Sequence, residues 1–79
     1  MKADEVQVGC IVKTRDLGET TGMMAHEHHL KNRVEDKPGR VFAFLEPEND
    51  VALVFVRHGS KEAVYFTYEL DLMADPVHE

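Results

Sequence analysis

Three histidines and a glutamate fill four consecutive positions of this chain, His26-Glu27-His28-His29. Neutral imidazoles and carboxylates are ligands for zinc, which needs three or four of them converging on one point. In an extended segment His26 and His28 share a face, and in a helical turn His26 and His29 do. Either geometry supplies two ligands, so we expect a complete site only if a distant residue provides a third.

The candidate distant ligands are Cys10, His58 and a carboxylate such as Glu19. The zinc-protease motif H-E-x-x-H needs a histidine at position 30, where the chain has Leu30. The incomplete ligand count favours a solvated polar loop, and we expect no cofactor. A metal-binding protein that uses the three clustered histidines is the alternative function. A loop that responds to pH is a third interpretation, because imidazole titrates near neutral pH.

Cys10 is the only cysteine, so the sequence allows no intrachain disulfide. It lies beside Gly9 in a run of alternating apolar residues, and we expect it to be buried as a small hydrophobic residue. A Cys-His enzyme would need a third group to orient the histidine, and the sequence marks none. We therefore predict that the protein is not an enzyme.

Aromatic residues are the candidates for a partner-binding surface. Side chains alternate between the two faces of a strand, so Val41, Ala43 and Leu45 are expected on one face and Phe42 and Phe44 on the other. Either the long loop covers one aromatic pair, or that pair is exposed for binding. The residues predicted to bind a partner are Phe42, Phe44, Tyr65, Tyr68, Met23 and Met24.

Length and charge limit the classes of protein. The chain has 79 residues, 43% of them hydrophobic, which predicts one domain over residues 1–79. A net charge of −6 disfavours nucleic-acid binding, which needs a positive patch, and favours a partner protein that is locally basic. No apolar run approaches the ~20 residues of a membrane span, and the N-terminal stretch lacks a signal region. We expect a soluble, cytoplasmic protein.

The apolar pattern has a period of two, which is the period of a β-strand. Gly9 predicts a bend inside the first apolar run, and Asn49-Asp50 and Gly59 predict hairpin turns. The predicted strands are residues 6–12, 40–46, 51–57 and 62–67, followed by a turn at 68–70 and a closing segment.

The segment 17–38 is too long for an ordinary connection, and loops of this length are usually functional or disordered. One helical turn is expected near Met24 to Leu30, because Gly18 and Gly22 argue against a longer helix. Short strands and tight turns predict an all-β fold, a partly open barrel of about five antiparallel strands with one long loop.

The chain also carries a series of short motifs, namely Val6-x-Val8-Gly9-x-x-Val12, Pro38-Gly39-x-Val41, Phe55, Gly59, Tyr65 and Glu69-Leu70. This layout resembles that of SH3-like small barrels, and most of all the NifZ-type domain of nitrogen-fixation operons. The resemblance runs from about residue 6 to residue 72. It implies an SH3-like barrel and an accessory role in nitrogenase assembly through protein contacts. The run at 26–29 does not match the family pattern, so no functional residue is transferred.

The expected function is a small, non-enzymatic module that binds another protein or assists an assembly. A link to nitrogenase maturation is implied by the resemblance alone. An unpaired edge strand is compatible with a monomer or a weak homodimer.

Overall fold

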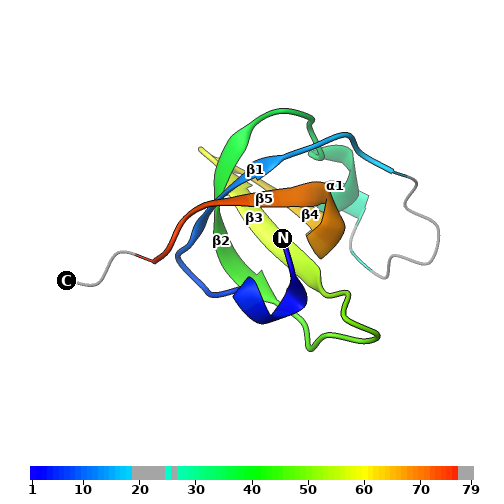
Figure 1. The fold of residues 1–79 in the computed structure, drawn as a ribbon. Helices are drawn as coiled ribbons and strands as arrows, with labels where there is room; N and C mark the ends of the chain where they lie inside the picture. The colour runs from blue at the N-terminus through cyan, green and yellow to red at the C-terminus, as the bar shows by residue number, and fades with distance from the viewer. Residues whose placement is uncertain (19–24, 26, 77–79) are drawn as a thin grey trace.

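One antiparallel sheet of five strands makes up most of the structure, a computed structural model that describes residues 1–18, 25 and 27–76. The strand order is β4-β3-β2-β1-β5, with β4 and β5 at the open edges (Figure 1). The strands are β1 Ile11–Thr14, β2 Pro38–Phe44, β3 Leu53–His58, β4 Lys61–Phe66 and β5 Leu70–Ala74. The helical elements are the 3-10 turns η1 Ala3–Glu5 and η2 Thr67–Glu69 and the helix α1 Glu27–Lys31. The predicted all-β, barrel-like fold is confirmed.

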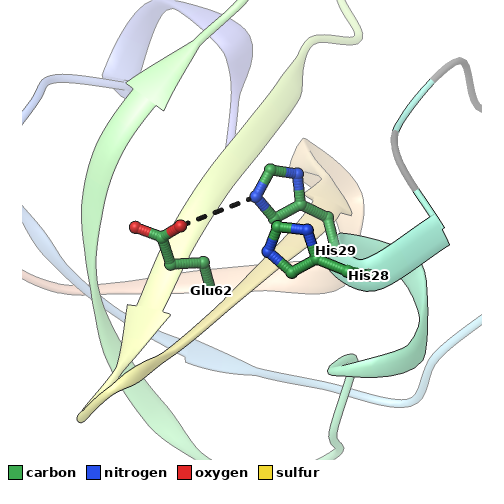
Figure 2. A group of neighbouring side chains, drawn as sticks. All are labelled: His28, His29 and Glu62. Carbon is green, nitrogen blue, oxygen red and sulfur yellow. Dashed lines mark ion pairs between the residues drawn. The ribbon is translucent and has the colours of Figure 1, made fainter.

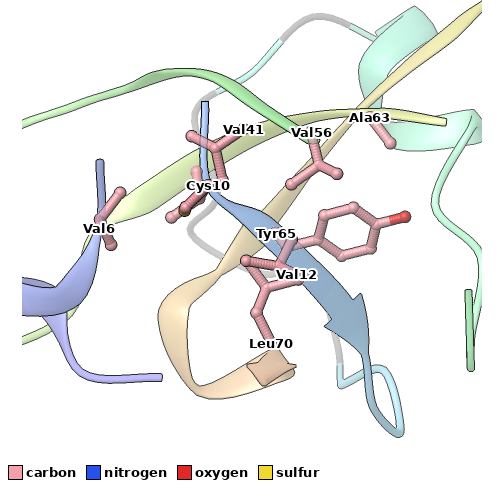
Figure 3. Packing of buried hydrophobic residues seen from close by; sticks show 9 residues of the cluster. Val6, Cys10, Val12, Val41, Val56, Ala63, Tyr65 and Leu70 are labelled. Carbon is pink, nitrogen blue, oxygen red and sulfur yellow. The ribbon is translucent and has the colours of Figure 1, made fainter. Parts of the chain in front are cut away.

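The sheet curls around a core that is rich in valine. Val12, Val41 and Val56, from the three central strands, are at most 1% exposed (Figure 3). Tyr65 from edge strand β4 and Leu70 from edge strand β5 join the same cluster, so both edges border one core. Branched side chains suit a pleated strand, and full burial of each valine contributes about 1.5–3 kcal/mol.

The chain that leads into β1 differs from the prediction. A strand was expected over residues 6–12, but β1 begins at Ile11. Gly9 has a φ of 96°, the predicted bend, and it interrupts the run. Val6 and Cys10 still point into the core, whereas Val8 between them is 57% exposed. The expected burial of Cys10 is therefore confirmed.

Both predicted hairpin turns are present. Asn49 and Asp50 have φ values of 53° and 64°, and both central residues of a type I′ turn need a positive φ. Glu48 and Val51 close this turn with two backbone hydrogen bonds. At the β3–β4 turn only Gly59 has a positive φ, 64°, as the first position of a type II′ turn requires.

A β-bulge in β2 changes which side chains face outward. Val41 lies opposite Val56, but Ala43 lies opposite Phe55, so Phe42 is the extra residue. Phe42 and Ala43 therefore both lie on the outer face, where the Phe42 ring lies 6.1 Å from that of Phe55. The prediction that Val41 and Ala43 share one face is wrong, because one inserted residue reverses the alternation. For the same reason Phe42 and Phe44 do not share a face, since Phe44 lies opposite the core residue Val54.

The long connection between β1 and β2 contains α1, which confirms the single helical turn expected in this segment. No helix formed by residues 1–18, 25 and 27–76 is long and apolar enough to cross a membrane. The predicted site residues that lie outside the described part of the chain are Met23, Met24, His26 and Glu19.

Gly39 lies in β2 with residues of β3 packed closely against its backbone. A Cβ atom at this position would lie 2.4 Å from Val56 Cγ1, 2.8 Å from His58 Nδ1 and 2.9 Å from the Arg57 carbonyl oxygen. The backbone oxygen and the buried valine cannot move aside without disturbing the core. Only glycine fits this position without displacing its neighbours.

We expect Gly39→Ala to lower the free energy of unfolding by about 1–3 kcal/mol, the usual cost of overpacking. Urea denaturation followed by circular dichroism measures this change. Gly18→Ala is the matched control, because a Cβ there would meet only a Glu69 oxygen at 3.7 Å. Equal midpoints for the two variants would contradict the close approach at Gly39.

Candidate functional site

The outer face of the sheet, opposite the core, divides into a covered half and an open half. Helix α1 packs against β4, and Val64 beneath it is fully buried. The ring of His29 in α1 meets Phe55 of β3 edge to face, with 5.4 Å between ring centroids. Leu53 and Phe66, which pair across the same two strands, lie beyond the helix. The position of α1 thus determines which side chains are available for binding.

Two side chains that follow α1 hold this segment against edge strand β4. Asn32 Nδ2 donates to the Glu62 carbonyl oxygen at 3.0 Å, and Arg33 Nη1 donates to the Val64 carbonyl oxygen at 2.8 Å. These carbonyl groups point away from β3, where an edge strand is otherwise open to pairing. The connection is therefore fixed along the edge of the sheet.

Arg33 also forms a buried ion pair with Glu69. Arg33 Nη1 and Nη2 lie 2.9 and 2.6 Å from the two carboxylate oxygens, and the side chains are 5% and 1% exposed. The same oxygens accept the backbone N–H groups of Phe66 at 2.9 Å and Gly18 at 2.8 Å. Burial by itself raises the pKa of Glu69, but these hydrogen bonds outweigh it and the pKa is lowered.

Tyr65 and His58 belong to the core, not to a binding surface. His58 Nδ1 lies 2.8 Å from the Pro38 carbonyl oxygen, which can only accept, so Nδ1 carries the proton. His58 Nε2 lies 2.8 Å from the Tyr65 hydroxyl, which also accepts the Val34 N–H at 3.1 Å. Burial raises the pKa of Tyr65. The prediction that Tyr65 faces a partner is wrong, because its hydroxyl completes this internal network and its side chain is fully buried.

The described histidines of the 26–29 run lie next to a glutamate from β4. The rings of His28 and His29 are 4.1 Å apart, and His29 Nε2 lies 3.7 Å from Glu62 Oε1 (Figure 2). One ligand atom from each of the three residues lies within 4.8 Å of the others. The distant residue that lies beside these histidines is thus Glu62, whereas Cys10 and His58 are buried in the core and lie outside this cluster.

Arg57 holds the other oxygen of Glu62. Its Nη2 atom lies 2.7 Å from Glu62 Oε2, and this hydrogen bond is the main cause that lowers the pKa of Glu62. The Arg57 guanidinium also lies over the Phe42 ring, 4.9 Å from its centroid, so Phe42 is half-buried. At neutral pH Glu62 therefore faces the histidines as a carboxylate.

The open half of the outer face contains a groove beside the β2–β3 turn, with a volume of about 360 Å³. We call it the hairpin groove; its lining residues are Leu45, Glu46, Glu48, Asn49, Val51, Ala52, Leu53 and Phe66. The ring of Tyr68 stacks on Phe66 at 5.3 Å with an interplanar angle of 9°, which extends the apolar surface. Tyr68 is 55% exposed and Leu45 is 50% exposed.

Sequence reasoning identified part of this surface. Tyr68 was predicted, but Leu45, Leu53 and Phe66 were missed. The predicted Phe44 is exposed at the end of β2, but it lies opposite the core residue Val54 and outside the groove lining. The apolar character of both faces of residues 51–57 was the available signal. This signal places Leu53 and Phe55 on a second apolar face, but it does not indicate which of them α1 covers.

Comparison with known proteins identifies no relative: no protein-family model, curated protein or solved structure matches this chain. The likeness to the NifZ-type domain therefore stays a prediction.

The Arg33–Glu69 pair gives a prediction about pH. The folded protein lowers the pKa of Glu69, so the pair contributes stability above the unfolded carboxyl pKa of about 4.3 and loses it as pH falls further. We expect Glu69→Gln to cost about 3–5 kcal/mol at pH 7, because it leaves a buried guanidinium without a counter-charge. Thermal unfolding between about pH 7 and pH 3 measures both effects.

Two further variants compare the stability contributed by the buried Arg33–Glu69 pair with that of an exposed ion pair. Arg57→Gln breaks an exposed ion pair and should cost less than about 1 kcal/mol. A double variant, Arg33→Met with Glu69→Leu, should recover part of the lost stability, since no unpaired charge remains. A cost for Glu69→Gln as small as that for Arg57→Gln would contradict the role of the buried pair.

Proposed function

We propose that this chain is a non-enzymatic protein-binding module and that the hairpin groove is its docking surface. The observation that carries the proposal is the uneven cover of the outer face. Val64 and Phe55 lie against α1, whereas Leu53 and Phe66 line an open groove together with Leu45. Exposed apolar clusters with a polar rim are typical of protein interaction sites.

The chemistry of the groove favours one kind of occupant. Its floor is apolar, while Glu46 and Glu48 lie on its rim and Asp50 is in the adjoining turn. An apolar side chain flanked by lysine or arginine would fill the floor and face the carboxylates. The net charge of −6 would also speed the approach of such a segment. The partner we propose is a protein segment with a leucine or aromatic residue between basic residues.

The resemblance to the NifZ-type domain supports an accessory role in assembly, which a docking groove of this kind would serve. It makes a nitrogenase assembly protein the first natural partner to test. The peptide experiment below depends only on the chemistry of the groove and does not require that resemblance.

A library of random peptides displayed on phage tests the proposed chemistry. We expect selected peptides to contain an apolar residue flanked by lysine or arginine, and to lose binding when those basic residues become glutamate. Amide shifts in a ¹⁵N NMR titration should be centred on Leu45, Leu53, Phe66 and Tyr68. Selection of acidic peptides, no selection at all, or shifts centred elsewhere would overturn the proposal.

Surface variants give a quantitative test. Leu45→Ser and Tyr68→Ala should each weaken binding of a selected peptide by roughly 5- to 30-fold, or about 1–2 kcal/mol, which is more than most interface residues contribute. Met73→Ser is the matched control, because Met73 is 59% exposed on β5 and lies outside the groove. All three variants replace exposed side chains, so their unfolding temperatures should stay close to that of the wild type. Equal loss in the control would contradict the site.

A further inference from the structure

The cluster of His28, His29 and Glu62 lies on the covered half of the outer face, away from the residues that line the hairpin groove. Two of these residues come from α1 and one from β4, more than thirty positions later in the chain. We propose that they form a site for a divalent transition metal, with zinc as the preferred ion. This inference goes beyond the proposed function and does not depend on it.

The separations suit a site that closes by small side-chain rotations. A tetrahedral zinc ion with ligands at ~2.1 Å places their atoms roughly 3.4 Å apart. His29 Nε2 and Glu62 Oε1 already lie 3.7 Å apart, and one ligand atom from each of the three residues lies within 4.8 Å of the other two. Figure 2 shows the two imidazoles side by side and turned toward the carboxylate. These separations exceed the tetrahedral value by at most about 1.4 Å, which rotations of the three side chains would need to close.

The donor set selects the class of ion. Two imidazoles and one carboxylate suit zinc, nickel or cobalt, whereas magnesium and calcium prefer oxygen ligands alone. Three protein ligands leave a fourth position of a tetrahedral zinc for water or for a side chain of a partner. The site would therefore be open on its solvent side.

Neighbouring residues hold these ligands in place. Arg57 binds Glu62 Oε2 at 2.7 Å and leaves Oε1 directed toward His29. Asn32 fixes the Glu62 backbone through its carbonyl oxygen, and Phe55 packs against the His29 ring. Such supporting contacts orient metal ligands, and their loss commonly weakens metal affinity 10- to 100-fold. An exposed pair of histidines on a loop would lack this support.

The test is titration of tag-free protein with zinc chloride alone, measured by isothermal calorimetry and checked by native mass spectrometry. We expect one zinc ion per chain, and weaker binding at acidic pH because protonated imidazoles cannot bind. His28→Gln and Glu62→Gln should each weaken binding by more than about 10-fold. Cobalt in place of zinc should give a visible absorption band that Glu62→Gln abolishes.

Two controls separate ligand loss from structural damage. Glu35→Gln removes an exposed carboxylate from the same connection and should leave zinc affinity unchanged. Arg57→Gln removes a supporting contact but keeps the ligand, so it should weaken zinc binding less than Glu62→Gln does. If Glu62→Gln leaves affinity unchanged, or if Arg57→Gln weakens binding as much as Glu62→Gln does, the three-residue site is overturned.

Discussion

The buried pair of Arg33 and Glu69 is the interaction on which the rest of the structure depends. It joins the connection after β1, the segment after α1 and the turn before β5, because Glu69 also accepts the N–H groups of Gly18 and Phe66. A buried ion pair offsets its desolvation cost only when its remaining hydrogen-bonding groups are satisfied, and here all four bonds to Glu69 come from fixed donors. Because Arg33 follows α1 by two residues, its ion pair with Glu69 fixes the position of the helix on the sheet. It therefore determines both which part of the outer face stays open and which glutamate the histidines meet.

Polar side chains also solve the problem of the open edge. A small sheet with a bare edge strand is prone to pair with other chains. Along β4 the carbonyl groups of Glu62 and Val64 accept hydrogen bonds from Asn32 and Arg33, and the N–H of Phe66 donates to Glu69. Side chains from a connection thus take the place of a further strand. In the sequence Asn32 and Arg33 are typical of a loop, but in the structure their side chains hydrogen-bond to the sheet.

The sequence predicts the elements of this fold better than their contacts. The period of two, the Asn49-Asp50 pair and Gly59 located strands and turns, because these signals act between near neighbours. The faces of β2 were misassigned because a single extra residue, Phe42, leaves no mark in the apolar pattern. The burial of Tyr65 was missed because its hydroxyl is satisfied by His58, seven positions away and on the same inner face.

The candidate site shows the same division between local and distant information. The histidine run predicted a metal site only if a distant residue joined it, and the candidates were Cys10, His58 and several carboxylates. Glu62 lies beside His29 because Asn32 and Arg33 hold the connection against β4. Long-range contacts decide which carboxylate lies beside the histidines, and the spacing of residues near the histidine run does not reveal that choice. The same contacts decide that Leu53 is open while Phe55 is covered.

The Asn49-Asp50 turn borders the hairpin groove through Asn49, and two backbone hydrogen bonds between Glu48 and Val51 close this turn. A recess bordered by such a turn exists before any ligand arrives. Association would then order the incoming segment alone, and little of the interaction energy would be consumed in shaping the receptor. Affinity at this surface would then depend mainly on how much of its bound conformation the incoming segment already adopts before it binds.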